Sequence, residues 1–254
     1  MATHDPAPSA AGATPLSIRR VLAESVGTFR RGWRPLLILA AVIELPLVLA
    51  EVVLEVTPSL RGLVEEESLV GIVALLTIYG SLSHHFLAGL LERVVSTERR
   101  GLPRPPLRAV VRHLPWLRLV VADLMLTALI VGGLAFFLLP GLVISTWFAL
   151  TLPIINLEDR TVVSAFGRSY RLVRGHSGRV AVIAIGAFLV PEAVVGLVGA
   201  ALHTGNVAVD IVVHAIPATL LLPLAALPLV VATIDLVALD ASRARHRAPG
   251  SSGG

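Results

Sequence analysis

Carboxylates inside long apolar stretches are the first residues of this sequence that could do chemistry. Glu44 lies near the middle of one such stretch, and Glu51 and Glu55 follow it at spacings of seven and eleven residues. These spacings place all three on one helical face. Other apolar stretches contain Asp123, Glu192 and Asp235. An ionised side chain at the centre of a bilayer costs about 2.5–3.5 kcal/mol on insertion scales, so a proton-coupled or cation-handling cavity is one use for such a set.

A structural interpretation of the same candidate intramembrane residues is favoured over that functional one. Glu51 and Glu55 would reach the water outside, and Glu44 would be protonated or hydrogen-bonded within a helix bundle. Asp123 and Asp235 would pair with nearby arginines, as charges in membranes usually find partners.

The adjacent histidines His84 and His85 suggest a metal site or, with Ser81 and Ser83 close by, a serine nucleophile. Neighbouring residues on a helix point about 100° apart, so the two rings rarely bind one metal. The metalloprotease spacing His-Glu-x-x-His is absent, and a nucleophile would need a base such as His214 to be placed by the fold. We therefore favour polar packing between helices and predict no catalytic, metal or cofactor site; an intramembrane serine hydrolase is a third alternative.

The basic residues are all arginine, 21 in number, and they gather beside the apolar stretches, while cysteine is absent. The lack of cysteine excludes disulfides and thiol chemistry. Arginines beside apolar spans indicate the positive-inside bias of membrane proteins rather than nucleic-acid binding. The expected partners are therefore the anionic head groups of membrane lipids, or a protein partner at the cytoplasmic face.

The elements that must position these residues are membrane helices. The sequence is 55% hydrophobic, above the roughly 45–50% of soluble domains, and several runs approach the roughly 20 apolar residues that span hydrocarbon. We predict an all-α polytopic protein with about six transmembrane helices in three hairpins. The predicted spans are residues 35–56, 69–91, 116–139, 142–157, 180–202 and 211–239. Pro140-Gly141 predicts a tight turn between the third and fourth spans, and three prolines predict a kinked or broken sixth span.

The arginine distribution predicts the orientation of these spans. Only Arg61 lies in a segment assigned to the outside, which requires both termini to be cytoplasmic. An all-arginine composition is typical of a GC-rich bacterial genome, so we predict a multi-pass protein of the bacterial plasma membrane. No signal peptide is expected, because the first apolar run begins late and no cleavage site follows it. Residues 15–240 form the predicted membrane domain, between disordered tails at 1–14 and 241–254.

A short basic amphipathic helix is predicted ahead of the first, third and fifth spans, and we expect each to lie in the cytoplasmic interface. Their apolar faces are Ile18, Val21, Leu22, Val26 and Phe29; Leu107, Val110, Val111, Leu114 and Leu117; and Val163, Phe166, Tyr170 and Val173. The candidate contacts for lipid or a partner are Arg108 and Arg112 beside the second face, and Arg168, Arg171 and Arg174 beside the third.

The stretch from Leu139 to Val182 resembles the membrane domain associated with some bacterial glycerophosphoryl diester phosphodiesterases and with many stand-alone membrane proteins. The resemblance is carried by Pro140-Gly141, by the spacing from Pro153 to Glu158, and by the run Ala165, Arg168, Ser169, Leu172, Val173, Arg174 and Gly175. It implies a helical membrane unit without hydrolysis, because in that family the chemistry belongs to a separate soluble barrel with a His-Arg-Gly motif. The nearest string here, His246-Arg247-Ala248, lacks the glycine.

These observations together predict a non-catalytic membrane component that contacts anionic lipid or scaffolds a partner protein. The alternative is a small transporter or exporter component that uses the intramembrane carboxylates Glu44 and Glu192. The sequence favours the first, because its most organised polar residues are the arginines of the predicted cytoplasmic face.

Overall fold

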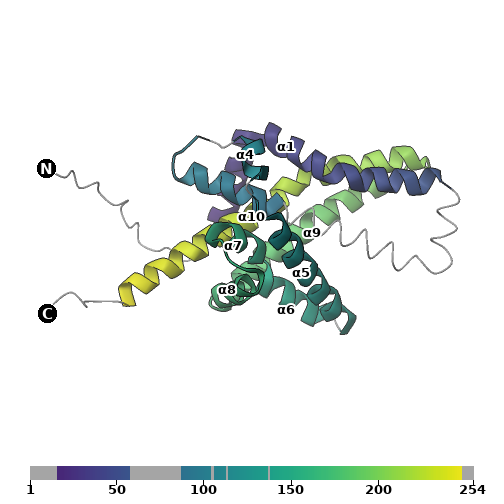
Figure 1. The fold of residues 1–254 in the computed structure, drawn as a ribbon. Coiled ribbons are helices and arrows are strands. Elements are labelled where there is room, and N and C mark those ends of the chain that lie inside the picture. The colour runs from purple at the N-terminus through teal and green to yellow at the C-terminus, as the bar shows by residue number, and fades with distance from the viewer. Residues whose placement is uncertain (1–15, 58–86, 104–105, 113, 137, 248–254) are drawn as a thin grey trace, which may run out of the picture.

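The computed structural model describes residues 16–57, 87–103, 106–112, 114–136 and 138–247. Within these ranges the chain is helical, with turns between the helices and no strand. The helices are α1 (Ile18–Val56), α4 (Leu107–Arg112), α5 (Trp116–Phe136), α6 (Leu138–Phe148), α7 (Thr151–Glu158), α8 (Val162–Arg174), α9 (Ser177–Ala201) and α10 (Val207–Arg247) (Figure 1). Residues 87–99 are also helical and are called segment 87–99 below.

Five helical stretches among the described residues are long and apolar enough to cross a membrane. They are Ile18–Ala50, Trp116–Gly133, Leu139–Glu158, Ser177–Ala201 and Val209–Arg245. These correspond to five of the six predicted spans. Most of the remaining span, residues 69–91, lies outside the described residues, so six spans stay a prediction.

The helix α1 joins the first predicted amphipathic helix to the first span, with a break between them. The backbone leaves helical geometry at Gly32 (φ −146°, ψ 36°), and Pro35 follows without the N–H that would continue the hydrogen-bond ladder. Ahead of the break, Val21 is fully buried, whereas Leu22 and Val26 are about half exposed. The predicted apolar face is therefore divided between the protein interior and the surroundings.

The crossing of α5 and α6 differs from the predicted turn at Pro140-Gly141. Helix α6 begins at Leu138, so both residues lie in its first turn, where a proline costs no hydrogen bond. Gly141 instead permits close packing, because a Cβ on Gly133 of α5 would lie only 3.0 Å from the Cα of Gly141. The fourth predicted span is also divided, since a turn at residues 149–150 separates α6 from α7.

The longest helix is α10. It runs without a break through Pro217, Pro223 and Pro228, because neighbouring helices and the remaining ladder satisfy the freed backbone groups; the predicted break is not found, and a kink stays a prediction. It also extends to Arg247, whereas a disordered tail was predicted from residue 241; alanine and arginine there favour helix. Its 41 residues span about 60 Å at 1.5 Å per residue, about twice the hydrocarbon thickness.

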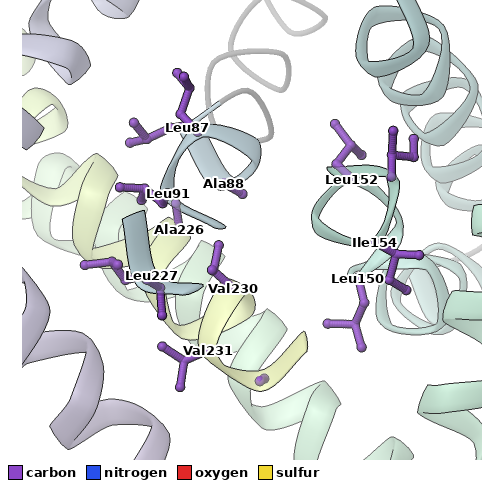
Figure 2. Close-up of a cluster of buried hydrophobic side chains, with 14 of the residues drawn as sticks. Leu87, Ala88, Leu91, Leu150, Leu152, Ile154, Ala226, Leu227, Val230 and Val231 are labelled. Carbon is purple, nitrogen blue, oxygen red and sulfur yellow. The ribbon is translucent and has the colours of Figure 1, made fainter. Parts of the chain in front are cut away.

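The hydrophobic core surrounds segment 87–99 and the middle of α10. Figure 2 shows Leu87, Ala88 and Leu91 beside side chains of α10, with Leu150, Leu152 and Ile154 contributed from the start of α7. Helix α10 also packs along both α1 and α9, and in Figure 1 it runs through the middle of the molecule. Asp235 and Asp240 of α10 accordingly lie within ion-pair distance of residues from other elements, while the yellow end of α10 projects beyond them (Figure 1).

Candidate functional site

Arg168 of α8 is the centre of an ion-pair network that ties three helices together. Its Nη1 donates to Oδ2 of Asp240 in α10 at 2.6 Å, and its Nε and Nη2 donate to Oε1 of Glu158 at the end of α7 at 3.1 and 3.0 Å. Arg160 also donates to Glu158. Burial alone would lower the pKa of Arg168, but the hydrogen bonds to Glu158 and Asp240 outweigh burial and raise it. Arg168 is thus engaged within the protein, with only 15% of its side chain exposed.

Phe166, Tyr170 and Val173 of the apolar face of α8 pack against the protein itself, whereas Val163 is 75% exposed; the placement of this helix in the cytoplasmic interface stays a prediction. Phe166 lies edge-on to Phe148 of α6 with ring centroids 5.1 Å apart, and Tyr170 lies edge-on to Trp147 at 5.2 Å. The hydroxyl of Ser169 donates to the carbonyl oxygen of Trp147 at 2.8 Å. The neighbouring helices α6, α7 and α10 give these side chains a closely packed environment.

The outer face of this region is basic. Arg171 and Arg174 of α8, Arg179 of α9, and Arg243 and Arg245 of α10 are all exposed, and no hydrogen bond or ion pair to another described residue is found for any of them. We call these five residues the arginine face. The sequence predicted Arg168, Arg171 and Arg174 as one set of contacts, whereas the structure gives Arg168 an internal role and leaves the other two outward.

A shallow hollow opens within the arginine face, where the end of α8 and the start of α9 meet α10. It is lined by Arg171, Leu172, Gly175, His176, Leu236, Leu239, Asp240 and Arg243. Its free space is about 40 Å³, room for a few water molecules or a small ion, and well below the size of pockets that enclose organic ligands.

A second ion-pair network lies around Asp235, one and a half turns before Asp240 on α10. Arg99 of segment 87–99 reaches Asp235 at 2.8 Å and Glu24 of α1 at 2.6 Å, and Arg20 lies 3.7 Å from Asp235. Burial would lower the pKa of Arg99, but its hydrogen bonds to Glu24 and Asp235 raise it. This pairing agrees with the structural interpretation of Asp235 given above.

The other candidate carboxylates are not gathered into one site. Glu44 and Asp123 are buried in different helices, at 8% and 0% exposure, and Glu192 lies exposed on the outer side of α9. Across the described ranges no group of three or more histidine, aspartate and glutamate side chains is arranged to hold a metal. The side chains of Glu51 and Glu55, and the whole of Ser81, Ser83, His84 and His85, lie outside the described residues.

The remaining predicted residues have ordinary surroundings. Arg108 and Arg112 are exposed on α4, which has only six residues. Of the apolar face predicted there, Val110 is buried but Leu117, now in α5, is 77% exposed. At the opposite end of the molecule, Asp210 pairs with His203 at 2.9 Å, and the ring of His214 packs against Gly199.

Sequence reasoning missed the acidic partners of both networks and the burial of Glu92. Glu158, Asp240 and Glu24 look like isolated surface charges in the sequence, and their partners lie up to 75 residues away. Glu92 follows the predicted end of the second span at residue 91, yet it is 3% exposed. A signal was available, since Leu87, Leu91 and Val95 continue at helical spacing past the predicted end of the span.

Comparison with known proteins gives a family and no function. Residues 109–242 match the model of a domain of unknown function, DUF7847. No curated protein and no solved structure matches the chain. The matched region covers more than half of the sequence and includes the Arg168 network and most of the arginine face, so the chain belongs to the DUF7847 family.

Proposed function

We propose that this member of the DUF7847 family is a non-catalytic integral membrane protein that binds anionic lipid head groups through its arginine face. The observation that carries the proposal is that Arg168 pairs within the protein, whereas no partner among the described residues is found for the arginine face. Arg168 and Arg160 together balance the charges of Glu158 and Asp240, so the arginine face keeps positive charge that the described protein does not use. Arg108 and Arg112, exposed on α4, would add to this charge at the same membrane surface.

Exposed apolar side chains support the membrane part of the proposal. Phe188, Val190 and Leu197 of α9 are between 60 and 71% exposed, and Ile38 and Val42 of α1 are each 62% exposed. A helix that exposes apolar side chains on several sides, as α9 does, is typical of a membrane span. We place the protein in a bacterial plasma membrane with six spans and both termini in the cytoplasm.

Electrostatics supports the lipid part of the proposal. The cytoplasmic leaflet carries anionic lipids, and each arginine near its surface contributes about 1 kcal/mol of attraction. The planar guanidinium also matches the geometry of phosphate oxygens. The resemblance to the phosphodiesterase-associated membrane domain fits this role, because it implies a membrane unit without the hydrolytic barrel.

The test is lipid binding by the full chain in detergent, measured by native mass spectrometry with phosphatidylglycerol and phosphatidylcholine. Changing both Arg171 and Arg174 to glutamine should weaken phosphatidylglycerol binding by about 2 kcal/mol, roughly thirtyfold, and leave phosphatidylcholine binding unchanged. The control changes both residues to lysine, which keeps the charge and should retain most of the affinity. Equal phosphatidylglycerol binding by the wild type and the glutamine variant would overturn the proposal.

A small transporter is the second candidate function, favoured by the complete burial of the Asp123 carboxyl in α5. Buried intramembrane carboxylates often belong to ion or proton pathways. Glu192 gives no support, because it lies on the outer side of α9. Reconstituted flux that is abolished by Asp123→Asn, while the variant still folds, would favour transport over lipid binding alone.

A further inference from the structure

The hollow in the arginine face combines two unused guanidinium groups with one compensated carboxylate. Arg171 and Arg243 line it from α8 and α10, and both are exposed, with no hydrogen bond or ion pair found to the described part of the chain. Asp240 also lines the hollow, but its Oδ2 accepts from Arg168 at 2.6 Å. The charge that remains available inside the hollow is therefore positive.

A third group in the hollow has unused hydrogen-bonding capacity. His176, between α8 and α9, has a buried Nδ1 atom with no hydrogen-bond partner among the described residues. A buried nitrogen without a partner costs free energy, and a ligand oxygen or an ordered water would remove that cost. Next to it, Gly175 has open space above its Cα, since an added Cβ would meet nothing within 4 Å. A ligand can thus approach the backbone at this point.

From these groups we infer that the hollow binds a single phosphate group, supplied by an anionic lipid head group or by free phosphate. Guanidinium groups from two helices can both donate to one tetrahedral oxyanion, and a turn of the His176 ring would bring its buried, unpartnered Nδ1 to the same ligand. The free space of about 40 Å³ admits a group of this size and leaves any attached glycerol or acyl chain outside. The inference rests on the proposed function, because it assigns one defined site within the arginine face.

The arginine face provides its own matched controls. Arg171 and Arg243 line the hollow, whereas Arg174 and Arg245 are exposed on the same two helices and do not line it. Each of the four changes to glutamine removes one positive charge from the C-terminal part of α8 or α10. If binding is a diffuse electrostatic attraction, the four substitutions should weaken it equally. If the hollow is a defined phosphate site, R171Q and R243Q should weaken binding more than R174Q and R245Q.

The experiment titrates the full chain in detergent with inorganic phosphate and with dihexanoyl phosphatidic acid, following heat release and the ring nitrogen resonances of His176. R171Q and R243Q should each weaken binding at least tenfold, as expected when a charge-assisted hydrogen bond is lost. R174Q and R245Q should weaken it by less than about threefold. The His176 resonances should shift on binding in the wild type and stay in place in R243Q.

The outcomes separate this inference from the broader proposal. Equal losses in all four variants would overturn the hollow as a site and leave the lipid-binding function standing. If the wild type bound neither inorganic phosphate nor dihexanoyl phosphatidic acid but still bound phosphatidylglycerol, the hollow would also be overturned as a site and the lipid-binding function would stand. No effect of any variant on either probe or on phosphatidylglycerol would overturn both. Tighter binding of phosphatidic acid than of inorganic phosphate would support a lipid source, and equal binding would support free phosphate.

Discussion

Arg168 and its neighbours illustrate how one arginine-rich helix can serve two purposes. A guanidinium group has five donors in a fixed plane, and Arg168 uses them to bridge Glu158 of α7 and Asp240 of α10. Arg171 and Arg174 follow three and six residues later on the same helix, and both are exposed. The internal arginine therefore fixes the position of the outward ones.

We predict that Arg168→Gln destabilises the protein by about 2 kcal/mol. Breaking a buried ion pair costs about 3–5 kcal/mol, and we reduce this figure because Asp240 is half exposed and Glu158 keeps Arg160. Thermal unfolding in detergent, followed by circular dichroism, measures the change. Arg171→Gln is the control and should stay within about 0.5 kcal/mol of the wild type; equal stability of both variants would contradict an internal role for Arg168.

Glu92 should make stability depend on pH. Burial raises the pKa of this carboxyl, and a hydrogen bond with Ser96 opposes the rise only in part. Because the folded pKa lies above the unfolded value, the folded state binds the proton more tightly. The resulting stability is complete below the unfolded pKa and is lost as the pH rises through the folded pKa.

Glu92→Gln replaces the carboxyl with a neutral group of the same shape, so it should raise the melting temperature at neutral pH. The same change should flatten the dependence of melting temperature on pH between about 4 and 7, the range around and above the ordinary carboxyl pKa. Melting curves of both proteins across this range check the prediction. Parallel curves would show that Glu92 is not the titrating group.

At the scale of elements, the close crossing of α5 and α6 depends on glycine at one position and not at its neighbour. A Cβ on Gly133 would lie 2.9–3.0 Å from Ile144 and from the backbone of Gly141, whereas one on Gly132 would meet nothing within 4 Å. Backbone atoms on the facing helix cannot move aside as a side chain can. The two glycines should therefore respond differently to the same substitution.

We expect Gly133→Ala to lower the stability of the protein by about 1–3 kcal/mol, the usual cost of overpacking. Gly132→Ala should be neutral or stabilising by up to about 1 kcal/mol, because alanine has the higher helix propensity. Thermal unfolding of the two variants in one detergent makes the comparison. A larger loss for the Gly132 variant would contradict the crossing.

The sequence predicts the bounds of a helix well where its hydrophobic run is continuous, and poorly where contacts with other helices determine where the helix ends. The third and fifth spans, predicted at 116–139 and 180–202, correspond to α5 and α9 within a few residues. The turn that divides α6 from α7 has no glycine or proline to mark it. The ion-pair networks could not be predicted either, because pairs such as Arg168 and Asp240 are 72 residues apart and only the packing of α8 on α10 brings them together.

At the scale of the whole molecule, the arginine face and the turn between α9 and α10 mark opposite ends of α9. Arg174 lies just before this helix and Thr204 just after it. At 25 residues, α9 is about 37 Å long at 1.5 Å per residue, enough to cross the hydrocarbon. The two residues should therefore lie on opposite sides of the membrane.

The chain has no cysteine, so single cysteines report this orientation without background. We predict that a membrane-impermeant maleimide labels Thr204→Cys in intact cells and labels Arg174→Cys only after the cells are opened. Both residues are exposed. Thr204→Cys removes the hydroxyl that donates to Asp210, but the backbone N–H of Thr204 still donates to the same carboxylate, so the fold should be retained. Labelling of the Arg174 position in intact cells would contradict cytoplasmic placement of the arginine face.

The Asp235 network also has a consequence for the order in which the protein assembles. Glu24 and Arg99 leave the ribosome early and can pair at once, whereas Asp235 is made more than 130 residues after Arg99. Segment 87–99, whose Leu87, Ala88 and Leu91 lie beside side chains of α10 (Figure 2), therefore has one flank uncovered until α10 is made. Synthesis of α10 closes that flank, so a ribosome that stalls before residue 226 releases a chain with an open core, which quality-control proteases can recognise.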